Sequence, residues 1–501
     1  MTFEIFLFIV LILFVFKYCS PNSRLKEYGD KLPGPSAYPI IGNGLVFYTS
    51  KTMIQALHEL CQSYGPVLRL WLGSKLWICL CDPADIGVFL NSTKHLNKSD
   101  LLRLLDSWLG TKGLVTSNAD VWRVHRKLLT PCFHFKILQE SLDMIQKNAE
   151  ILCDQLKPKE DQTEFDILEY VEKCSLDIIC ETAMGVRLQT QVLKHSIYLE
   201  SLKKVKNSTI NRLFKAWLHP EFIFQLSNYG RIYYKKLNVI KEEVRKVIVE
   251  RRKILQNQIQ ENSTDVSNVN NGRKQGKQFL DMMLTESDFT NEEIENEVQT
   301  FMFAGHDTSM TAISFCIYLL SQHQQIQDKC LEEIRKMRTL ERNRKITLHD
   351  YMNLKYLENV IKETLRYYTI VPLIARKVEE DVVLPSGHFL PAGSAVNFNL
   401  LHLHRNEKYF PKADQFIPER FDNRADSMQN YAFIPFSAGS RNCIGQRFAM
   451  LEMKVIISTL LLRYQFLPAE KVKSLTLETG IVLRSLENIP VKITARNFRT
   501  Y

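Results

Sequence analysis

The chain has 501 residues, of which 45% are hydrophobic and 24% charged, the composition of a globular protein with a substantial core. Its formal net charge is +10. No run of basic residues is interleaved with aromatic ones and no zinc-ligand spacing occurs, so we exclude a nucleic-acid partner; a diffuse basic excess suits an acidic protein or an anionic membrane surface. The eleven cysteines are odd in number and scattered, and Cys79 and Cys81 are close without forming a C-x-x-C pair. This pattern favours a reducing compartment over a disulfide framework.

The first element is an uninterrupted apolar run at residues 5–16, which its flanking residues extend to a marginal membrane span. A cleaved signal peptide would need a basic start and a small-residue cleavage site, whereas Glu4 precedes the run and no clean site follows it. A buried core helix is the other alternative, which the extreme N-terminal position disfavours. Positive charge follows the run, so we expect residues 1–20 to be a signal-anchor helix that leaves the body in the cytosol.

Prolines dominate the next segment, Leu32 to Gly42, and predict a stiff, extended connector, so we assign residues 21–42 as a linker and hinge. Residues 67–81 place β-prone residues on both sides of a Gly-Ser-Lys turn and predict a hairpin. Helical patterns without recognisable chemistry fill much of 136–258. The polar stretch 260–277 predicts a surface loop.

A helix opens at Trp122, and Arg126 follows four residues later, so the two side chains share a face. An indole N–H and a guanidinium on one face suit a carboxylate. The alternative is a cation–π or packing pair.

A capping box of Thr290 and Glu293 opens a long helical pattern with Ala304-Gly-His-Asp-Thr-Ser309 in its apolar middle. A glycine here allows a flat ligand to approach. The acid and alcohol of Asp307 and Thr308 can deliver the protons that cleavage of dioxygen needs. The alternative is a threonine that only hydrogen-bonds to its own helix.

Two further stretches carry charge. Glu363 and Arg366 face each other on a predicted helix, and Arg420 follows in Pro-Glu-Arg-Phe. The alternative to a buried triad is a solvated surface pair. Arg376 lies in a predicted strand, and His402 and His404 have an alternating spacing that we interpret as strand or turn rather than metal ligation.

The last motif is Phe436-Ser-Ala-Gly439-Ser-Arg441-Asn-Cys443-Ile-Gly445, followed by an apolar helical run. The glycines allow a tight fold and a close approach to a flat ligand. A cysteine at a helix N-terminus favours the thiolate, which is a ligand of haem iron. The alternative is a buried structural cysteine.

The Cys443 string closely resembles the haem-binding signature of the cytochrome P-450 superfamily. The hinge, W-x-x-x-R, A-G-x-D-T, E-x-x-R and P-E-R-F motifs resemble the same family in order along nearly the whole chain. This resemblance implies a mainly helical fold with small antiparallel sheets and one catalytic domain at 43–501. It also implies haem b with Cys443 as the axial ligand, a buried Glu–Arg–Arg triad that fixes the cysteine loop, and propionate contacts from an arginine-rich set. The residues expected at the haem are Trp122, Arg126, Ala304, Arg376, Phe436, Gly439, Arg441 and Gly445.

The string EVQTFMFAGHDTS resembles family four, the fatty-acid ω-hydroxylase group and its insect relatives. Many members carry a glutamate, which can esterify the haem, where this chain has Ala304. The resemblance therefore implies non-covalent haem apart from the cysteine bond, and puts strict terminal hydroxylation in doubt. The implied reaction is monooxygenation of a small apolar substrate such as a fatty acid, another aliphatic lipid or a xenobiotic.

The resemblance also implies a place and partners: the endoplasmic reticulum membrane with the catalytic domain on the cytosolic side, NADPH-cytochrome P-450 reductase, and cytochrome b5 as a second donor. We expect Arg123, Lys127, Arg447 and Lys454 to form the docking patch for an acidic reductase. The alternatives are a haem-thiolate isomerase or dehydratase, or a non-catalytic haem sensor, neither of which needs the acid–alcohol pair.

Overall fold

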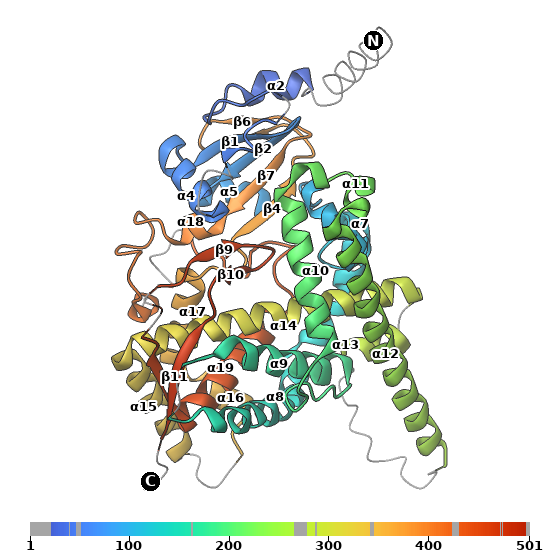
Figure 1. The fold of residues 1–501 in the computed structure, drawn as a ribbon, viewed down its shortest axis with the longest axis vertical. Coiled ribbons are helices and arrows are strands. Elements are labelled where there is room, and N and C mark those ends of the chain that lie inside the picture. Colours follow the sequence, from blue (N-terminus) through green and yellow to red (C-terminus); the bar gives the residue numbers. More distant parts are fainter. Residues whose placement is uncertain are drawn as a thin grey trace.

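The computed structural model describes residues 22–39, 41–46, 52–161, 164–264, 278–285, 288–340, 345–422, 430–470, 472 and 474–496. The predicted signal-anchor helix lies outside these ranges. Within them, none of the helices combines the length and the apolar character needed to cross a membrane. Helices dominate and the sheets are small, as expected (Figure 1).

A four-stranded sheet occupies one end of the molecule, with strand order β1 (Val67–Leu72), β2 (Lys75–Leu80), β7 (Ala395–Asn399), β4 (Leu373–Lys377) (Figure 1). The β1–β2 pair is the predicted hairpin, which is confirmed. The β2–β7 pair is parallel, so this sheet is mixed and the expectation of small antiparallel sheets is confirmed only in part. A parallel pair needs a long connection, and here the whole helical region separates the two strands in the sequence.

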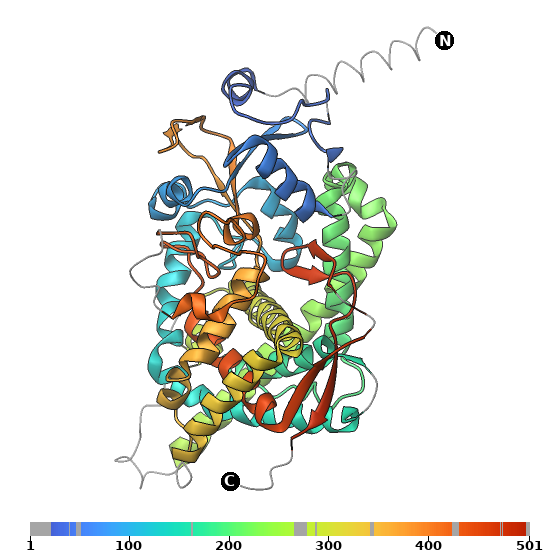
Figure 2. The ribbon, with the colours of Figure 1, turned by 90° about the vertical axis from the view of Figure 1, so that its left-hand side faces the viewer.

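The helical region is built around α14 (Asn291–Gln322), and Figure 2 looks almost along this helix at the centre of the molecule. Thr290 Oγ1 accepts the Glu293 N–H at 3.3 Å and Glu293 Oε2 accepts the Thr290 N–H at 2.9 Å, so the predicted capping box is confirmed. The second half of α14 is buried nearly all round, because neighbouring helices cover it on several sides. Those that pack against it include α9 (Ile167–Ile179), α12 (Asn228–Thr264), α17 (Lys355–Tyr367) and α19 (Gln446–Arg463).

The other helices are α2 (Ser23–Gly29), α4 (Met53–Tyr64), α5 (Pro83–Asn91), α6 (Asp106–Leu109), α7 (Ala119–Leu129), α8 (Phe135–Leu156), α10 (Ile197–Phe214), α11 (Glu221–Leu226), α13 (Phe279–Thr285), α15 (Gln324–Leu340), α16 (Leu348–Met352) and α18 (Leu400–His404). Short 3-10 or π segments are η1 (Asp100–Leu105), η2 (Thr130–Phe133), η3 (Lys157–Lys159), η4 (Cys180–Met184), η5 (Ala216–Leu218) and η6 (Pro418–Phe421). The small sheets comprise β3 (Phe165–Asp166) with β11 (Pro490–Ala495) and β8 (Tyr464–Pro468), β5 (Val382–Val383) with β6 (Phe389–Leu390), and β9 (Leu477–Thr479) with β10 (Leu483–Ser485).

Two local predictions are wrong. His402 and His404 lie in the short helix α18, which begins where the Asn399 side chain accepts the His402 N–H, so neither strand nor turn holds them. The polar stretch expected as a loop from residue 260 is still helical up to Thr264, since α12 continues past its apolar part. Residues 265–277 lie outside the described ranges.

Candidate functional site

The cysteine loop precedes α19 and is closed by a backbone hydrogen bond of 2.9 Å from Cys443 N–H to Phe436 O. Gly439 has φ +71°, and a Cβ there would lie 1.8 Å from Leu90 O, so only glycine fits. Gly445 is the N-cap of α19, and a Cβ there would meet nothing within 4 Å. The protein backbone itself therefore requires glycine at position 439, and the expected approach of a flat ligand at Gly445 stays a prediction.

Cys443 differs from every other cysteine in the part of the chain that the structure describes. The other nine described cysteines are buried, whereas its side chain is exposed. The surrounding protein raises the pKa of the Cys443 thiol, while the Gly445 N–H and the charge of Arg126 act against that rise. The helix N-terminus thus acts in the expected direction, because the Gly445 N–H lowers the pKa, but desolvation outweighs it and the net shift is upward. A bound metal cation would deprotonate it.

The predicted Trp122–Arg126 face is present on α7, but its two side chains do different things. Arg126 donates to Asn442 O and Oδ1, both at 2.7 Å, and so fastens the residue next to the cysteine. Trp122 is buried, and the guanidinium of Arg441 lies 4.7 Å from the centre of its ring. Helix α7 therefore contacts the cysteine loop through two side chains, Arg126 and Trp122.

Three cations gather beside this loop: Lys98, Arg376 and Arg441. Burial lowers the pKa of Arg376 to about 10, and burial together with the Arg376 charge lowers that of Arg441 to about 9. The pKa of Lys98 is also lowered, by burial and by both arginines. In the described ranges no acid pairs with them, and Arg441 Nε and Nη1 are buried without any partner. Like-charged donors of this kind, two of them buried and Lys98 half-buried, fit the two propionates of a haem.

Lys98 was missed from the sequence. It stands in a short loop stretch without a motif or a periodic pattern, and only the fold brings it to the two arginines.

On α14 the acid and the alcohol point to different neighbours. Thr308 Oγ1 donates to Ala304 O at 2.7 Å, and Asp307 Oδ1 accepts from Lys206 Nζ at 2.5 Å. Thr308 therefore forms the hydrogen bond to its own helix that the alternative interpretation predicts. A Cβ on Gly305 would lie 2.6 Å from Ile179 Cγ1, so this glycine serves the contact with α9 rather than the approach of a ligand.

A cavity of about 240 Å³ borders the Asp307 side of α14. Its wall includes Lys206 of α10, Met310 of α14 and Val482 between β9 and β10, but neither Thr308 nor Cys443. Water or small solutes can thus reach both Asp307 and Lys206. Asp307 is the residue directly before Thr308 on α14.

A second carboxyl that the sequence did not reveal lies at the crossing of α14 and α19. Glu452 is buried, and its Oε2 accepts from Ser309 Oγ at 2.7 Å while its Oε1 has no partner. Burial raises the pKa of Glu452 to about 8. This carboxyl is therefore mostly protonated at neutral pH, and its partner Ser309 is the residue that follows Thr308 on α14.

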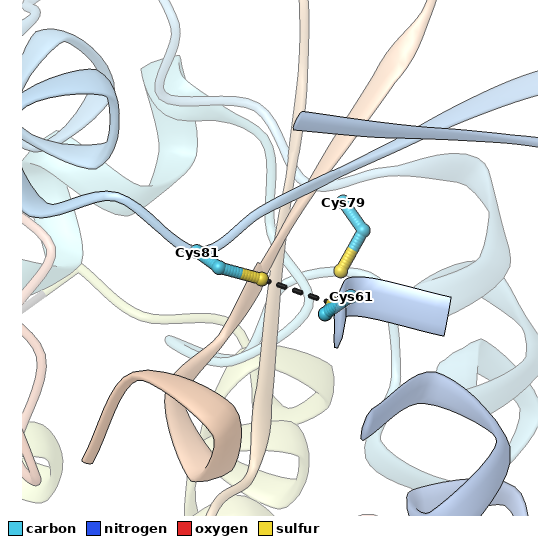
Figure 3. Close-up of side chains that lie close together, drawn as sticks. All are labelled: Cys61, Cys79 and Cys81. Carbon is cyan, nitrogen blue, oxygen red and sulfur yellow. Dashed lines mark hydrogen bonds between the residues drawn. The ribbon is translucent and has the colours of Figure 1, made fainter. Parts of the chain in front are cut away.

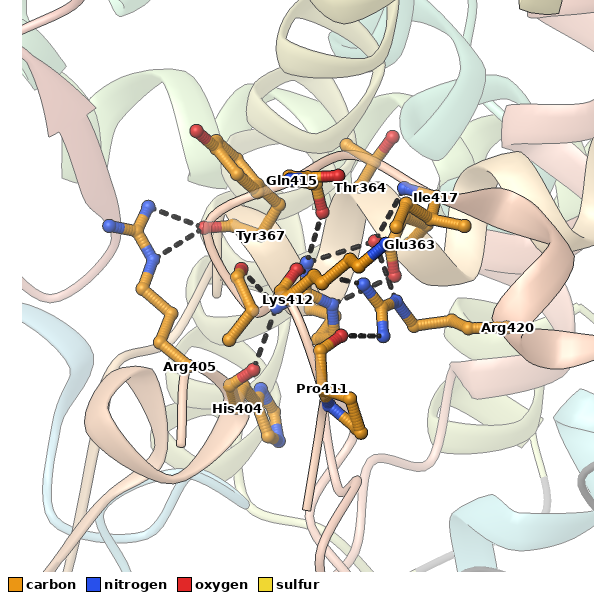
Figure 4. A network of polar contacts seen from close by, with 12 residues as sticks. Glu363, Thr364, Tyr367, His404, Arg405, Pro411, Lys412, Gln415, Ile417 and Arg420 are labelled. Atoms are coloured by element: carbon orange, nitrogen blue, oxygen red, sulfur yellow. Dashed lines mark hydrogen bonds and ion pairs between the residues drawn. The ribbon is translucent and has the colours of Figure 1, made fainter. Parts of the chain in front are cut away.

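The expected Glu–Arg–Arg triad is present and buried (Figure 4). Arg366 forms a two-pronged pair with Glu363 at 2.8 and 2.9 Å, and Arg420 Nε reaches the same carboxylate at 2.9 Å. Arg366 Nη1 also donates to the carbonyls of His404 and Ala413, both at 2.9 Å. The surface-pair alternative is thereby excluded, and the triad ties α17 to the chain that leads to the cysteine loop.

The predicted docking patch is only partly on the surface. Arg123, Lys127 and Arg447 are exposed. Lys454 is wrong as a member, since it is 4% exposed and its ammonium is 2.8 Å from Glu358. Position 454 falls on the inner face of α19, which the sequence pattern did not distinguish from the outer one.

The family model described as cytochrome P450 matches residues 32–491. The chain belongs to the cytochrome P450 family. It is a P450 monooxygenase, and its cofactor is haem b with a cysteine thiolate as axial ligand.

Three similar proteins support the assignment to family four. Cytochrome P450 4c3 of Drosophila melanogaster is 35% identical over 98% of this chain and 94% of its own length. Cytochrome P450 4c21 of Blattella germanica is 35% identical over 98% of both chains. Cytochrome P450 4V2 of Homo sapiens is 36% identical over 95% of this chain and 92% of its own. The resemblance found in the sequence is thus confirmed.

Proposed function

We propose that this P450 binds its haem through Cys443 and hydroxylates a small apolar substrate, a fatty acid or another aliphatic lipid or a xenobiotic, with electrons from NADPH passed on by a flavoprotein reductase. The observation that carries the assignment of Cys443 is its exposure, unique among the described cysteines, in a loop that Gly439 and Arg126 hold in place. When bound, the haem supplies the activation of dioxygen and the insertion of one oxygen atom into the substrate.

The chain's own residues bind and orient the cofactor. Arg376, Arg441 and Lys98 receive the propionates, because the two arginines are buried, the lysine is half-buried, and none of them has a counter-charge in the described structure. Trp122 packs under Arg441 and keeps its guanidinium in place. Ala304 carries no carboxylate, so we propose that no ester bond joins the haem to α14.

Proton supply is assigned to α14. Asp307 and Lys206 exchange protons with water at the cavity, and Thr308 holds its hydroxyl proton at Oγ1, on the Ala304 carbonyl, until substrate and oxygen bind. We assign Thr308 as the hydroxyl that passes the proton on.

Replacing Thr308 by alanine tests this role. Turnover should become uncoupled, with most of the NADPH consumed yielding hydrogen peroxide instead of product, while the haem content stays normal. Thr311 is a suitable control, because its hydroxyl makes the same kind of bond, to Asp307 O at 2.7 Å, one turn further along. Normal coupling in Thr308→Ala would refute this role of the threonine in proton delivery.

We further propose an anchored enzyme, with residues 1–20 in the endoplasmic reticulum membrane, 21–42 as linker and hinge, and 43–501 as the catalytic domain on the cytosolic side. Cytochrome b5 is the second electron donor of this proposal. The docking surface is reduced to Arg123, Lys127 and Arg447. Reversing these charges should slow reductase-supported turnover and spare peroxide-supported turnover, whereas an equal loss in both assays would refute the surface.

The experiment that decides the whole proposal is the ferrous carbonyl spectrum of the purified protein. Thiolate ligation gives a red-shifted band, and Cys443→Ser should abolish it. Its persistence in that variant would exclude Cys443 as the ligand. A substrate screen with reductase and NADPH, which reads product and the shift of the iron spectrum on binding, then identifies the substrate class.

A further inference from the structure

Three cysteines away from the haem loop converge on one point. The sulfurs of Cys61, Cys79 and Cys81 all lie within 4.8 Å of one another, and the Cys61 and Cys81 sulfurs are 3.1 Å apart (Figure 3). All three residues are at most 3% exposed. They belong to a small core between α4 and the four-stranded sheet, separate from the core of the helical region.

Two separate elements produce this convergence. Alternation along β2 turns Cys79 toward α4, and Cys81, two residues further, keeps the same side just past the strand end. Cys61 follows Leu57 by one turn on the buried face of α4. The spacing of Cys79 and Cys81 is therefore a strand spacing, and a search for the C-x-x-C pattern of loops misses it.

Polar groups gather around the sulfurs, which a purely apolar packing contact does not require. Asn397 is the partner of Cys79 in the parallel register, so both side chains stand on the same face of the sheet. Its Oδ1 is buried, at 1% exposure of the residue, and has no hydrogen-bond partner. Asn399, two residues further on β7, donates from Nδ2 to the Cys61 sulfur at 3.7 Å.

The sulfurs are also hydrogen-bonded to one another. Hydrogen bonds from Cys79 and Cys81 lower the pKa of the Cys61 thiol, whereas those of the other two are raised. Close by, His58 of α4 and His402 of α18 share a hydrogen bond of 3.1 Å.

We propose that Cys61, Cys79 and Cys81 form a structural zinc site, with three thiolates on the metal and Asn397 Oδ1 in the fourth position. Zinc prefers four donors in a tetrahedron with sulfurs at ~2.3 Å, which places the sulfurs about 3.8 Å from one another. The separations of 3.1 Å and at most 4.8 Å bracket that value. Small rotations of the three cysteine side chains are therefore enough to bring their sulfurs to the separations that zinc requires.

Charge decides between Zn²⁺ and Cu⁺, two single ions that thiolates select. With three thiolates, Zn²⁺ leaves one net negative charge in this apolar core, whereas Cu⁺ leaves two, and buried net charge is costly. The unpartnered oxygen of Asn397 also supplies the fourth donor that zinc uses and that a three-coordinate copper does not need.

The test uses the full-length holoenzyme expressed with added zinc and then dialysed against a mild chelator. We expect one zinc per haem iron by elemental mass spectrometry, and a zinc-edge X-ray absorption spectrum with three sulfurs at ~2.3 Å and one lighter donor. The iron of the haem does not interfere, because its absorption edge is separate.

Variants assign the ligands. Cys79→Ser and Cys81→Ala should each lower the zinc content at least tenfold, with the haem content as the check that the protein is folded. Cys330→Ser is the matched control, since Cys330 is equally buried but lies in α15 and outside the cluster. It should keep its zinc.

Three results would overturn the proposal. The first is a wild-type protein without stoichiometric zinc, and the second is a zinc spectrum without sulfur neighbours. The third is a Cys61–Cys81 disulfide found by mass spectrometry of the native protein, which would make the cluster a redox pair.

Discussion

Glu452 offers the sharpest test of the interior of this P450, because its carboxyl is fully buried and its pKa is raised to about 8. In the unfolded chain the same group titrates near 4.5. Between these two values the folded protein holds a proton that the unfolded chain has released. The contribution of Glu452 to stability is thus complete below pH 4.5 and is lost progressively as the pH rises to 8.

The magnitude follows from the shift. Stability should fall by about 1.4 kcal/mol per pH unit within this window, or about 3 kcal/mol between pH 5.5 and pH 8. Glu452→Gln removes the ionisation but keeps the oxygen that Ser309 donates to. The stability of the variant relative to the wild type should therefore increase by about 3 kcal/mol from pH 5.5 to pH 8. This change is expected even if the two proteins differ in stability at pH 5.5.

The assay is the midpoint of thermal unfolding of both holoproteins across this range. For a chain of this length 1 kcal/mol corresponds to roughly 1 °C, so the gap should widen by about 3 °C. Glu250→Gln, at an exposed position of α12, is the control and should run parallel to the wild type. Parallel curves for Glu452→Gln as well would show that this carboxyl does not titrate with a raised pKa.

Three further changes probe the site. Gly439→Ala should destabilise the protein by about 1–3 kcal/mol and strip most of the haem, because its Cβ would overlap a carbonyl oxygen. An unchanged thermal midpoint together with a normal haem content would refute the steric argument. Lys206→Met leaves the carboxylate of Asp307 without its partner and should lower the free energy of unfolding by about 2 kcal/mol. The loss is smaller than for a fully buried pair because the lysine side chain is 20% exposed. An unchanged thermal midpoint would contradict this expectation. Arg441→Leu removes a charged donor for a propionate and should weaken haem retention ten- to hundredfold in a transfer assay to apomyoglobin. Wild-type retention in this variant would show that Lys98, Arg376 and Arg441 do not hold the propionates.

The motifs of this chain could be found from the sequence where contiguous residues carry the chemistry. The cysteine loop, the capping box of α14 and the Glu363–Arg366 helix are of this kind, since spacing along one element decides which side chains meet. The family and its cofactor followed from these same stretches.

What the sequence could not supply is the direction of a side chain once several elements surround it. Asp307 and Thr308 are neighbours in the chain, yet only the position of α10 decides that the acid turns to Lys206. The sequence predicts a surface cation at Lys454, whereas the fold buries its side chain against Glu358. Lys98 lies in no pattern at all, and the fold alone brings it to the arginines.

The parallel pairing of β2 with β7 has a consequence for biosynthesis. Residues 77–80 leave the ribosome early, but their partners at 395–398 are made only after some 300 further residues. The β2 edge of the hairpin therefore stays unpaired while the helical region is translated. Contacts between segments so far apart in the sequence form slowly. The face that holds Cys79 is closed by β7 only near the end of synthesis, which makes completion of this sheet one of the latest events in the life of the nascent chain.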